Sequence, residues 1–165
     1  MKFDVDVDGA ESIVTALTAW GEEMSARAAE GMKAGLLCVE RKAKELCPFH
    51  TGELRSSIYT QVNATPNGAE GKVSAAKEYA VYVEMGTGQV GKASGGNGSG
   101  KTVSYRTGGW FVPVGRSEEM IADTVVQAAS KGFWTYGQQA RPYLYPAFKG
   151  NKKKIVAAIR KAIAD

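Results

Sequence analysis

The sequence predicts an α+β protein, in which an antiparallel β-sheet of about four or five strands packs against one long N-terminal helix and shorter C-terminal helices. Two observations support this prediction. Apolar residues recur every three or four positions through most of the first 46 residues, whereas short alternating segments dominate the middle of the chain. The helical and strand-like segments are grouped rather than alternating, which is typical of α+β proteins.

The composition of the 165 residues is that of a globular protein, with 44% hydrophobic and 23% charged residues. This balance argues against a wholly disordered chain, and the length suits a single domain over residues 1–165. No apolar run approaches the roughly 20 residues of a membrane helix, and the N-terminus lacks the pattern of a secretory signal. We therefore expect a cytoplasmic protein without membrane contact.

The N-terminal region predicts a short strand followed by a long helix. Residues 3–7 alternate apolar side chains with aspartate, as a half-buried strand does. The helix is expected to begin at about Gly9 and to run to Leu46 or Cys47, where Pro48 stops it.

One apolar stripe runs along this helix with the period of a straight α-helix. It comprises Ile13, Leu17, Trp20, Met24, Ala28, Met32, Leu36, Val39, Ala43 and Leu46. Because so long a helix exceeds the diameter of a domain of this size, we expect part of the stripe to pack on another chain. The alternative is two shorter helices with a kink at Gly21 or Gly31.

The remaining elements follow from alternation, turns and helical spacing. Strands are predicted at residues 57–62 and 71–75, joined as a hairpin by a turn at 66–68, and at residues 79–85 and 110–114. Helices are predicted over residues 117–131 and around residues 155–163.

Glycine is over-represented, with 20 residues where average usage gives roughly a dozen. Nine of them lie between Gly86 and Gly109. Unstructured segments of this length are uncommon in compact domains unless they are functional or disordered. We expect residues 86–109 to form a flexible loop that becomes ordered on docking.

Residues 95–102, from Gly95 to Thr102, match the phosphate-binding pattern G-x4-G-K-[ST]. That pattern binds phosphate only between a buried strand and a helix. Residues 89–94 do not resemble a buried strand, and residues 103–109 make a poor helix. A nucleotide-binding enzyme therefore remains an alternative that the flanking residues disfavour.

Cys38, Cys47 and His50 do not combine into a metal or catalytic site. Nine residues of helix would separate the two cysteines by roughly 13 Å, too far for a disulfide or one shared ion. Cys47 and His50 alone are too few ligands for a closed zinc site. No activated nucleophile accompanies His50, the only histidine. We expect no catalytic residue, no metal and no cofactor.

Charge is divided along the chain, although the net charge is only +4. The first 30 residues hold seven acids against two bases, and residues 141–165 hold seven bases against one acid. Such a division can draw copies together head to tail, or attract an acidic partner. The candidate residues for contact with DNA or a partner are Lys152, Lys153, Lys154, Arg160 and Lys161. The alternatives are a non-specific DNA-binding protein and a merely solvated helix face.

Three segments, taken in order, resemble a known family. Residues 43–58 are similar to its helix–Pro–x–x–Thr–Gly–x–Leu–Arg–x–Ser–Ile signature, and residues 79–88 to its Tyr–Ala–x–x–(Val/Ile)–Glu–x–Gly–Thr segment. Residues 137–148 are similar to its Gly–x–x–Ala–Arg–Pro–Phe–Leu–x–Pro–Ala segment. The family is the neck and tail-completion proteins of long-tailed double-stranded DNA bacteriophages and prophages. His50 and Tyr143 depart mildly from its pattern.

The resemblance implies a structural virion protein without enzymatic activity, a tail component that joins head and tail. It implies a homo-oligomeric ring around the DNA channel, and we expect a hexamer or a dodecamer. Its other partners would be neck and tail proteins and channel DNA. The protein would occupy the host cytoplasm before assembly and the head–tail junction of the virion afterwards.

The motifs supply the candidate residues for assembly. They are Thr51, Gly52, Leu54, Arg55, Ser57, Ile58, Tyr79, Glu84, Gly86, Thr87, Arg141 and Pro142. We expect Thr51 to cap a short helical turn that starts near Gly52, or to terminate the long helix together with Pro48. Both Gly52 and Gly86 should adopt backbone angles closed to other residues. Leu54 and Ile58 should pack on the sheet. Arg55 and Arg141 are candidates to pair with Glu84. These motifs serve either an interface or only the stability of the subunit.

Overall fold

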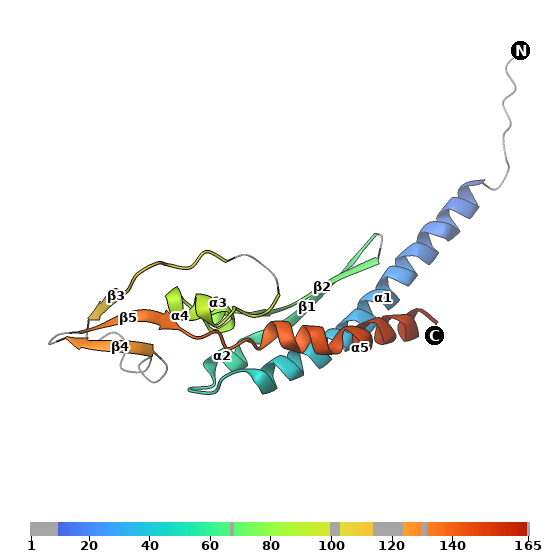
Figure 1. Cartoon of the computed structure of the whole chain (residues 1–165). Helices are drawn as coiled ribbons and strands as arrows, with labels where there is room; N and C mark the ends of the chain where they lie inside the picture. The colour runs from blue at the N-terminus through green and yellow to red at the C-terminus, as the bar shows by residue number, and fades with distance from the viewer. Residues whose placement is uncertain (1–9, 67, 100–102, 114–123, 130–131, 165) are drawn as a thin grey trace, which may run out of the picture. The chain divides into compact units, whose positions relative to one another are not determined.

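The computed structural model describes residues 10–66, 68–99, 103–113, 124–129 and 132–164. Figure 1 labels the helices and strands and colours them from blue near the N-terminus to red near the C-terminus. The elements are α1 (Ala10–Leu46), α2 (Glu53–Ser56), β1 (Ile58–Thr65), β2 (Gly68–Ala75), α3 (Ala80–Met85), α4 (Gly88–Ala93), β3 (Trp110–Pro113), β4 (Thr124–Ala129), β5 (Gly132–Gln138) and α5 (Leu144–Ala164). The α+β prediction is confirmed. The strand predicted over residues 3–7 lies outside the described residues.

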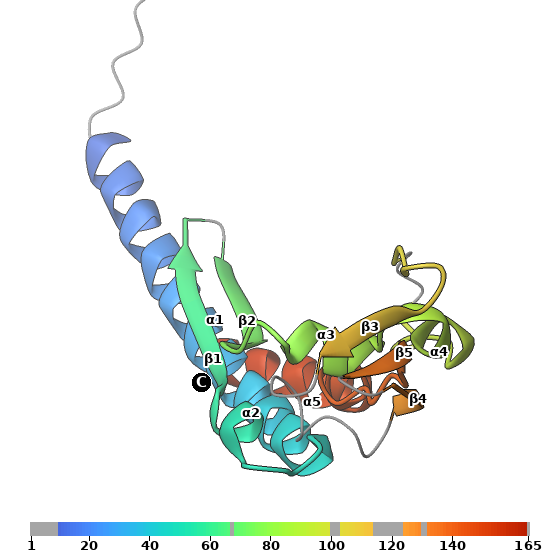
Figure 2. The same cartoon turned by 90° about the vertical axis from the view of Figure 1, so that its left-hand side faces the viewer.

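The strands form two sheets rather than the single sheet that we predicted. The predicted hairpin is present as β1 and β2, which form a two-stranded sheet (Figure 2). The second sheet has the order β3–β5–β4, and both of its strand pairs are antiparallel. Phe111 and Trp134 are cross-strand partners in it, and their rings meet edge to face at 6.1 Å.

Two predicted elements are wrong in type. Where a strand was predicted over residues 79–85, residues 80–85 form helix α3, whose buried residues Ala80 and Glu84 are four residues apart on one helix face. The alternating Val81 is 53% exposed. Residues 124–129 form strand β4 instead of a helix, because they pair with β5, a strand that the prediction missed. Residues 117–123, 130 and 131 of the predicted helix lie outside the described residues.

The chain divides into two compact units. The first comprises residues 1–37, 60–72 and 153–165, and the second comprises residues 38–59 and 73–152. In the described part of the chain no helix is long and apolar enough to cross a membrane.

In the first unit, α5 packs closely on α1 at two glycines. A β-carbon at Gly31 would lie 2.7 Å from the Cα of Ile159, and one at Gly35 would lie 2.7 Å from the Cα of Ile155. Both distances are shorter than real β-carbon contacts, so only glycine permits this approach. Helix α1 is continuous from Ala10 to Leu46, through both Gly21 and Gly31, so the predicted single helix is confirmed and the alternative of two shorter helices is wrong.

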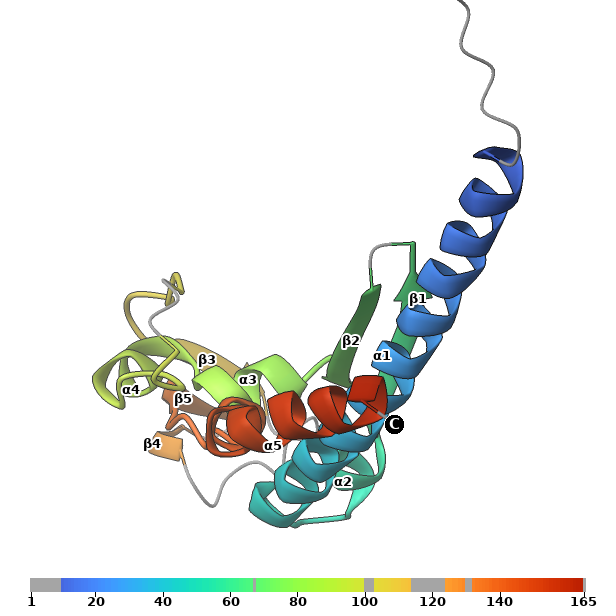
Figure 3. The same ribbon diagram turned by 90° about the vertical axis from the view of Figure 1, so that its right-hand side faces the viewer.

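The apolar stripe of α1 is buried only in part. Leu36, Val39 and Ala43 are at most 5% exposed. Leu17 and Trp20, nearer the beginning of the helix, are each 62% exposed. Figures 1 and 3 show that α1 extends in this direction past the end of α5.

Candidate functional site

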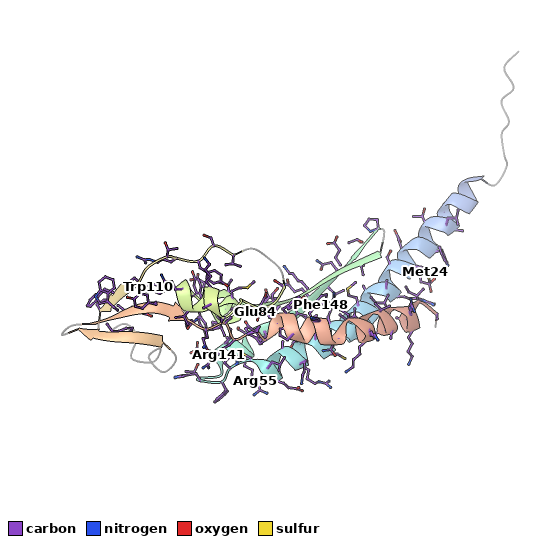
Figure 4. The ribbon with its side chains drawn as sticks, in the orientation of Figure 1. Met24, Arg55, Glu84, Trp110, Arg141 and Phe148 are labelled. Atoms are coloured by element: carbon purple, nitrogen blue, oxygen red, sulfur yellow. The ribbon has the colours of Figure 1, made fainter. Side chains whose placement is uncertain are left out.

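The second and third sequence motifs meet at the carboxylate of Glu84, which is only 6% exposed. Its Oε2 accepts hydrogen bonds from the backbone N–H groups of Tyr143 at 2.7 Å and Leu144 at 2.9 Å. Its Oε1 accepts from the backbone N–H of Tyr145 at 2.9 Å and from the side-chain amide of Asn97 at 3.2 Å. All of these residues belong to the second unit. Figure 4 marks Glu84 among the side chains.

Glu84 therefore caps α5 from a different helix. The first N–H groups of an α-helix have no partner within the helix, and its N-terminus favours negative charge. Helix α5 begins at Leu144, and its third residue, Pro146, carries no N–H. The three N–H groups left in the first turn, including that of the preceding Tyr143, all bind this carboxylate. A glutamate 59 to 61 residues away thus does the work of a local capping residue.

This arrangement differs in kind from the arginine pairing expected for Glu84. The described contacts of its carboxylate are with backbone amides and with Asn97. Arg141 contributes through its backbone, whose N–H donates to the carbonyl of Val83 at 2.8 Å. A pairing of Glu84 with the exposed side chains of Arg55 or Arg141 stays a prediction. The one sequence signal for the cap is Pro146, since proline is tolerated in the first turn of a helix and not further in.

The residues that follow Glu84 attach to the end of β5. The N–H of Thr87 donates to the carbonyl of Gln138 at 3.0 Å, and the N–H of Gln138 donates to the Thr87 Oγ1 at 3.0 Å. Gly86 has a φ of 75°, as expected from its motif, and a β-carbon there would lie 2.7 Å from the backbone nitrogen of Ala140. The glycine is therefore required both for its conformation and for this close approach.

We call this set of contacts the motif junction: Glu84, Gly86 and Thr87 with residues 138–145. Tyr79, which opens the second motif, precedes α3 and is 41% exposed, and Pro142 is half-buried within the junction. Part of the segment that we expected as a loop also contributes, because residues 88–93 are helix α4 and Asn97 binds Glu84.

The first motif forms the turn around α2. Gly52 has the expected positive φ, 83°, and the Thr51 Oγ1 accepts a long hydrogen bond of 3.4 Å from the N–H of Glu53, the first residue of α2. Leu54 and Ile58 are buried, at 7% and 1% exposure. The carbonyl of Ser57 accepts from the N–H of Ala76 at 3.1 Å and so joins the turn to the end of β2.

Tyr143 is the largest fully buried side chain near Glu84, and it departs from the phenylalanine of the motif. Its exposure is 0%, and among the described residues its hydroxyl has no hydrogen-bond partner. Burial raises the pKa of Tyr143 above its usual range, with smaller contributions from Cys47, Glu84 and Tyr79. Burial likewise raises the pKa of the Cys47 thiol, against a lowering influence of Arg55. The hydroxyl is thus a destabilising group in this core.

We predict that Tyr143→Phe raises the free energy of unfolding by up to about 1–2 kcal/mol, because it removes a buried polar group that lacks a protein partner. Urea denaturation followed by circular dichroism measures the change. Tyr82→Phe is a suitable control, since Tyr82 is 55% exposed and its hydroxyl group should matter little. A loss of stability in Tyr143→Phe would show that the hydroxyl contributes favourably.

The other candidate sites differ in what the structure describes. Lys152, Lys153, Lys154, Arg160 and Lys161 are all exposed on α5. The phosphate-binding pattern at residues 95–102 follows helix α4 rather than a strand, and Lys101 and Thr102 lie outside the described residues. The described residues contain no group of three or more His, Cys, Asp or Glu side chains placed to hold a metal ion.

Residues 11–86 match the model of the HK97-gp10-like family, described as "Bacteriophage HK97-gp10, putative tail-component". The matched residues make up just under half of the chain and contain the first motif and the second as far as Gly86. Comparisons with curated proteins and with solved structures yield no match. The resemblance to phage tail proteins is therefore confirmed over residues 11–86, which are similar to this family of bacteriophage proteins.

Proposed function

On the premise that residues 11–86 are those of a phage tail component, we propose that this chain is a structural subunit that joins head and tail in a tailed phage or prophage. Copies form a ring around the DNA channel at the head–tail junction, where they contact other neck and tail proteins. The chain acts by assembly and not by catalysis.

The observation that carries this proposal beyond the matched residues is the motif junction. The third motif lies outside residues 11–86, yet its backbone supplies three hydrogen bonds to Glu84 of the second motif. Two motifs that bind one another are best read as parts of one structure, which supports extending the tail-protein resemblance to residues 137–148. The roles of Thr51, Arg55 and Arg141 in assembly remain part of the proposal.

The test is a phage or prophage that lacks this chain. We expect its lysate to contain separate filled heads and tails in electron micrographs, and joined particles to return when the wild-type chain is supplied from a plasmid. The purified chain should also form rings of about six or twelve subunits, measured by light scattering and negative-stain imaging. Normal joined particles without the chain would contradict the proposal.

Non-specific DNA binding is the second candidate function, because the six bases of α5 are exposed. Its signature is an affinity for duplex DNA of any sequence that falls steeply with salt concentration, as counterions are released from the phosphates. Binding that resists salt, or no binding at low salt, would exclude it.

A further inference from the structure

The beginning of α1 presents an apolar face that the rest of the described chain leaves exposed. Leu17 and Trp20 are each 62% exposed. Half-buried Met24, which Figure 4 labels, follows on the same side of the helix by its spacing of four residues from Trp20. At 100° per residue this side also carries Gly31 and Gly35, where α5 packs. The face is thus a continuation of an existing helix–helix contact, past the end of α5.

Helix α5 carries a second exposed apolar face within the same unit. Val156 and Ile163 are 48% and 44% exposed. They lie seven residues apart, about a quarter turn around α5 from Ile155, which packs on α1. Both helices therefore expose apolar side chains beside the surfaces that they already use within the subunit.

The helix segments that carry the two faces have net charges of opposite sign. Residues 15–30 of α1 hold three acids, Glu22, Glu23 and Glu30, and one base, Arg27, which is paired with Glu23 at 2.8 Å. Residues 153–164 of α5 hold four bases and no acid. Pairing of α1 with α1, or of α5 with α5, would bring like charges together, whereas pairing of α1 with α5 brings opposite charges together.

We propose that the Leu17–Trp20 face of α1 in one copy docks on the Val156–Ile163 face of α5 in the next copy. Because two different surfaces meet, a pair of copies still has one free face of each kind, and the contact propagates until a ring closes. The partner is a second copy of this chain, so the inference rests on the proposed ring-forming function and names the surfaces that build the ring. One such contact is weak, and closure of the ring adds to its strength.

The test uses two variants that each lack one face. The first carries Leu17→Ser and Trp20→Ser, and the second carries Val156→Ser and Ile163→Ser. Since all four side chains are substantially exposed, both variants should melt like the wild type. We expect each variant alone to stay monomeric in sedimentation velocity up to several hundred micromolar, and an equimolar mixture to form a 1:1 dimer through the two intact faces. A matched control is Leu37→Ser, which alters a 45% exposed leucine on another side of α1 and should associate like the wild type.

The outcomes separate this inference from the proposed function. Three results would each overturn the proposed contact. They are association of the variants with wild-type affinity, dimerisation of the second variant by itself, and a wild-type chain that stays monomeric at millimolar concentration. These results concern only the contact between purified copies. They do not test whether a phage without the chain forms joined particles, so the head–tail role would stand. Conversely, normal particles without the chain would refute the function even where the mixture forms the dimer. A contact guided by charge should also weaken at least severalfold between 50 and 500 mM salt.

Discussion

Glu84→Gln is expected to lower the free energy of unfolding by roughly 2–4 kcal/mol, among the largest effects of a single isosteric change in this protein. The substitution keeps the shape of the side chain but removes the negative charge, and it turns one of two accepting oxygens into a donor. Three backbone N–H groups at the start of α5 converge on that carboxylate, so the amide leaves at least one of them without an acceptor. Burial at 6% exposure keeps solvent from compensating.

The measurement is urea denaturation with a matched control on another glutamate. Glu53 is paired with Lys77 at 2.7 Å, but the side chains are 60% and 40% exposed, so Glu53→Gln should change stability little. Hydrogen exchange of the amides of residues 143–145 gives a second readout, since those amides should lose protection in Glu84→Gln. Equal stability of the two variants would show that the cap contributes nothing.

Alanine substitutions at two glycines of α1 are expected to change stability in opposite directions. A β-carbon at Gly35 would lie 2.7 Å from the Cα and 3.2 Å from the Cβ of Ile155, so the two helices must separate, at a cost of about 1–3 kcal/mol. A β-carbon at Gly21 would have nothing within 4 Å. Gly21→Ala should therefore stabilise the protein by up to about 1 kcal/mol through helix propensity alone.

Thermal unfolding of the two variants beside the wild type checks this prediction, and each variant serves as the control for the other because both make the same change in one helix. The prediction is met if Gly35→Ala lowers the melting temperature and Gly21→Ala raises it. If Gly35→Ala also stabilises the protein, the close approach of α5 to α1 at that position is not a feature of the molecule in solution.

Periodicity predicted the long helix, the β1–β2 hairpin and the C-terminal helix, because each buries a face whose spacing is visible along the chain. It failed at residues 79–85, where seven residues satisfy both a strand and a helix pattern. Only the tertiary contact of Glu84 with the start of α5 decides between them. It failed again at β4, which is a strand because β5 pairs with it.

The sequence predicted Glu84, Gly86 and Thr87 as members of the candidate site, but not the hydrogen bonds of Glu84 to Asn97 and to the backbone of residues 143–145. The motifs named Glu84 and Arg141, but charge alone suggested a pair between their side chains. The missing information was that the backbone of residues 143–145 has no partner of its own. Gly31 was predicted only as a possible position of a kink, and no contact was predicted for Gly35, since nothing local to them reveals Ile155 and Ile159 on the other side.

The packing of α5 on α1 also fixes the order in which this protein can mature during its synthesis. Gly35 leaves the ribosome well over a hundred residues before Ile155, its packing partner. At translation rates of 5–20 residues per second, roughly 6–24 s pass between the synthesis of Gly35 and that of Ile155, and α5 cannot cover α1 during this time. During that time its apolar stripe is open to chaperones and to neighbouring nascent chains, so the first unit is completed only when the last helix has been made.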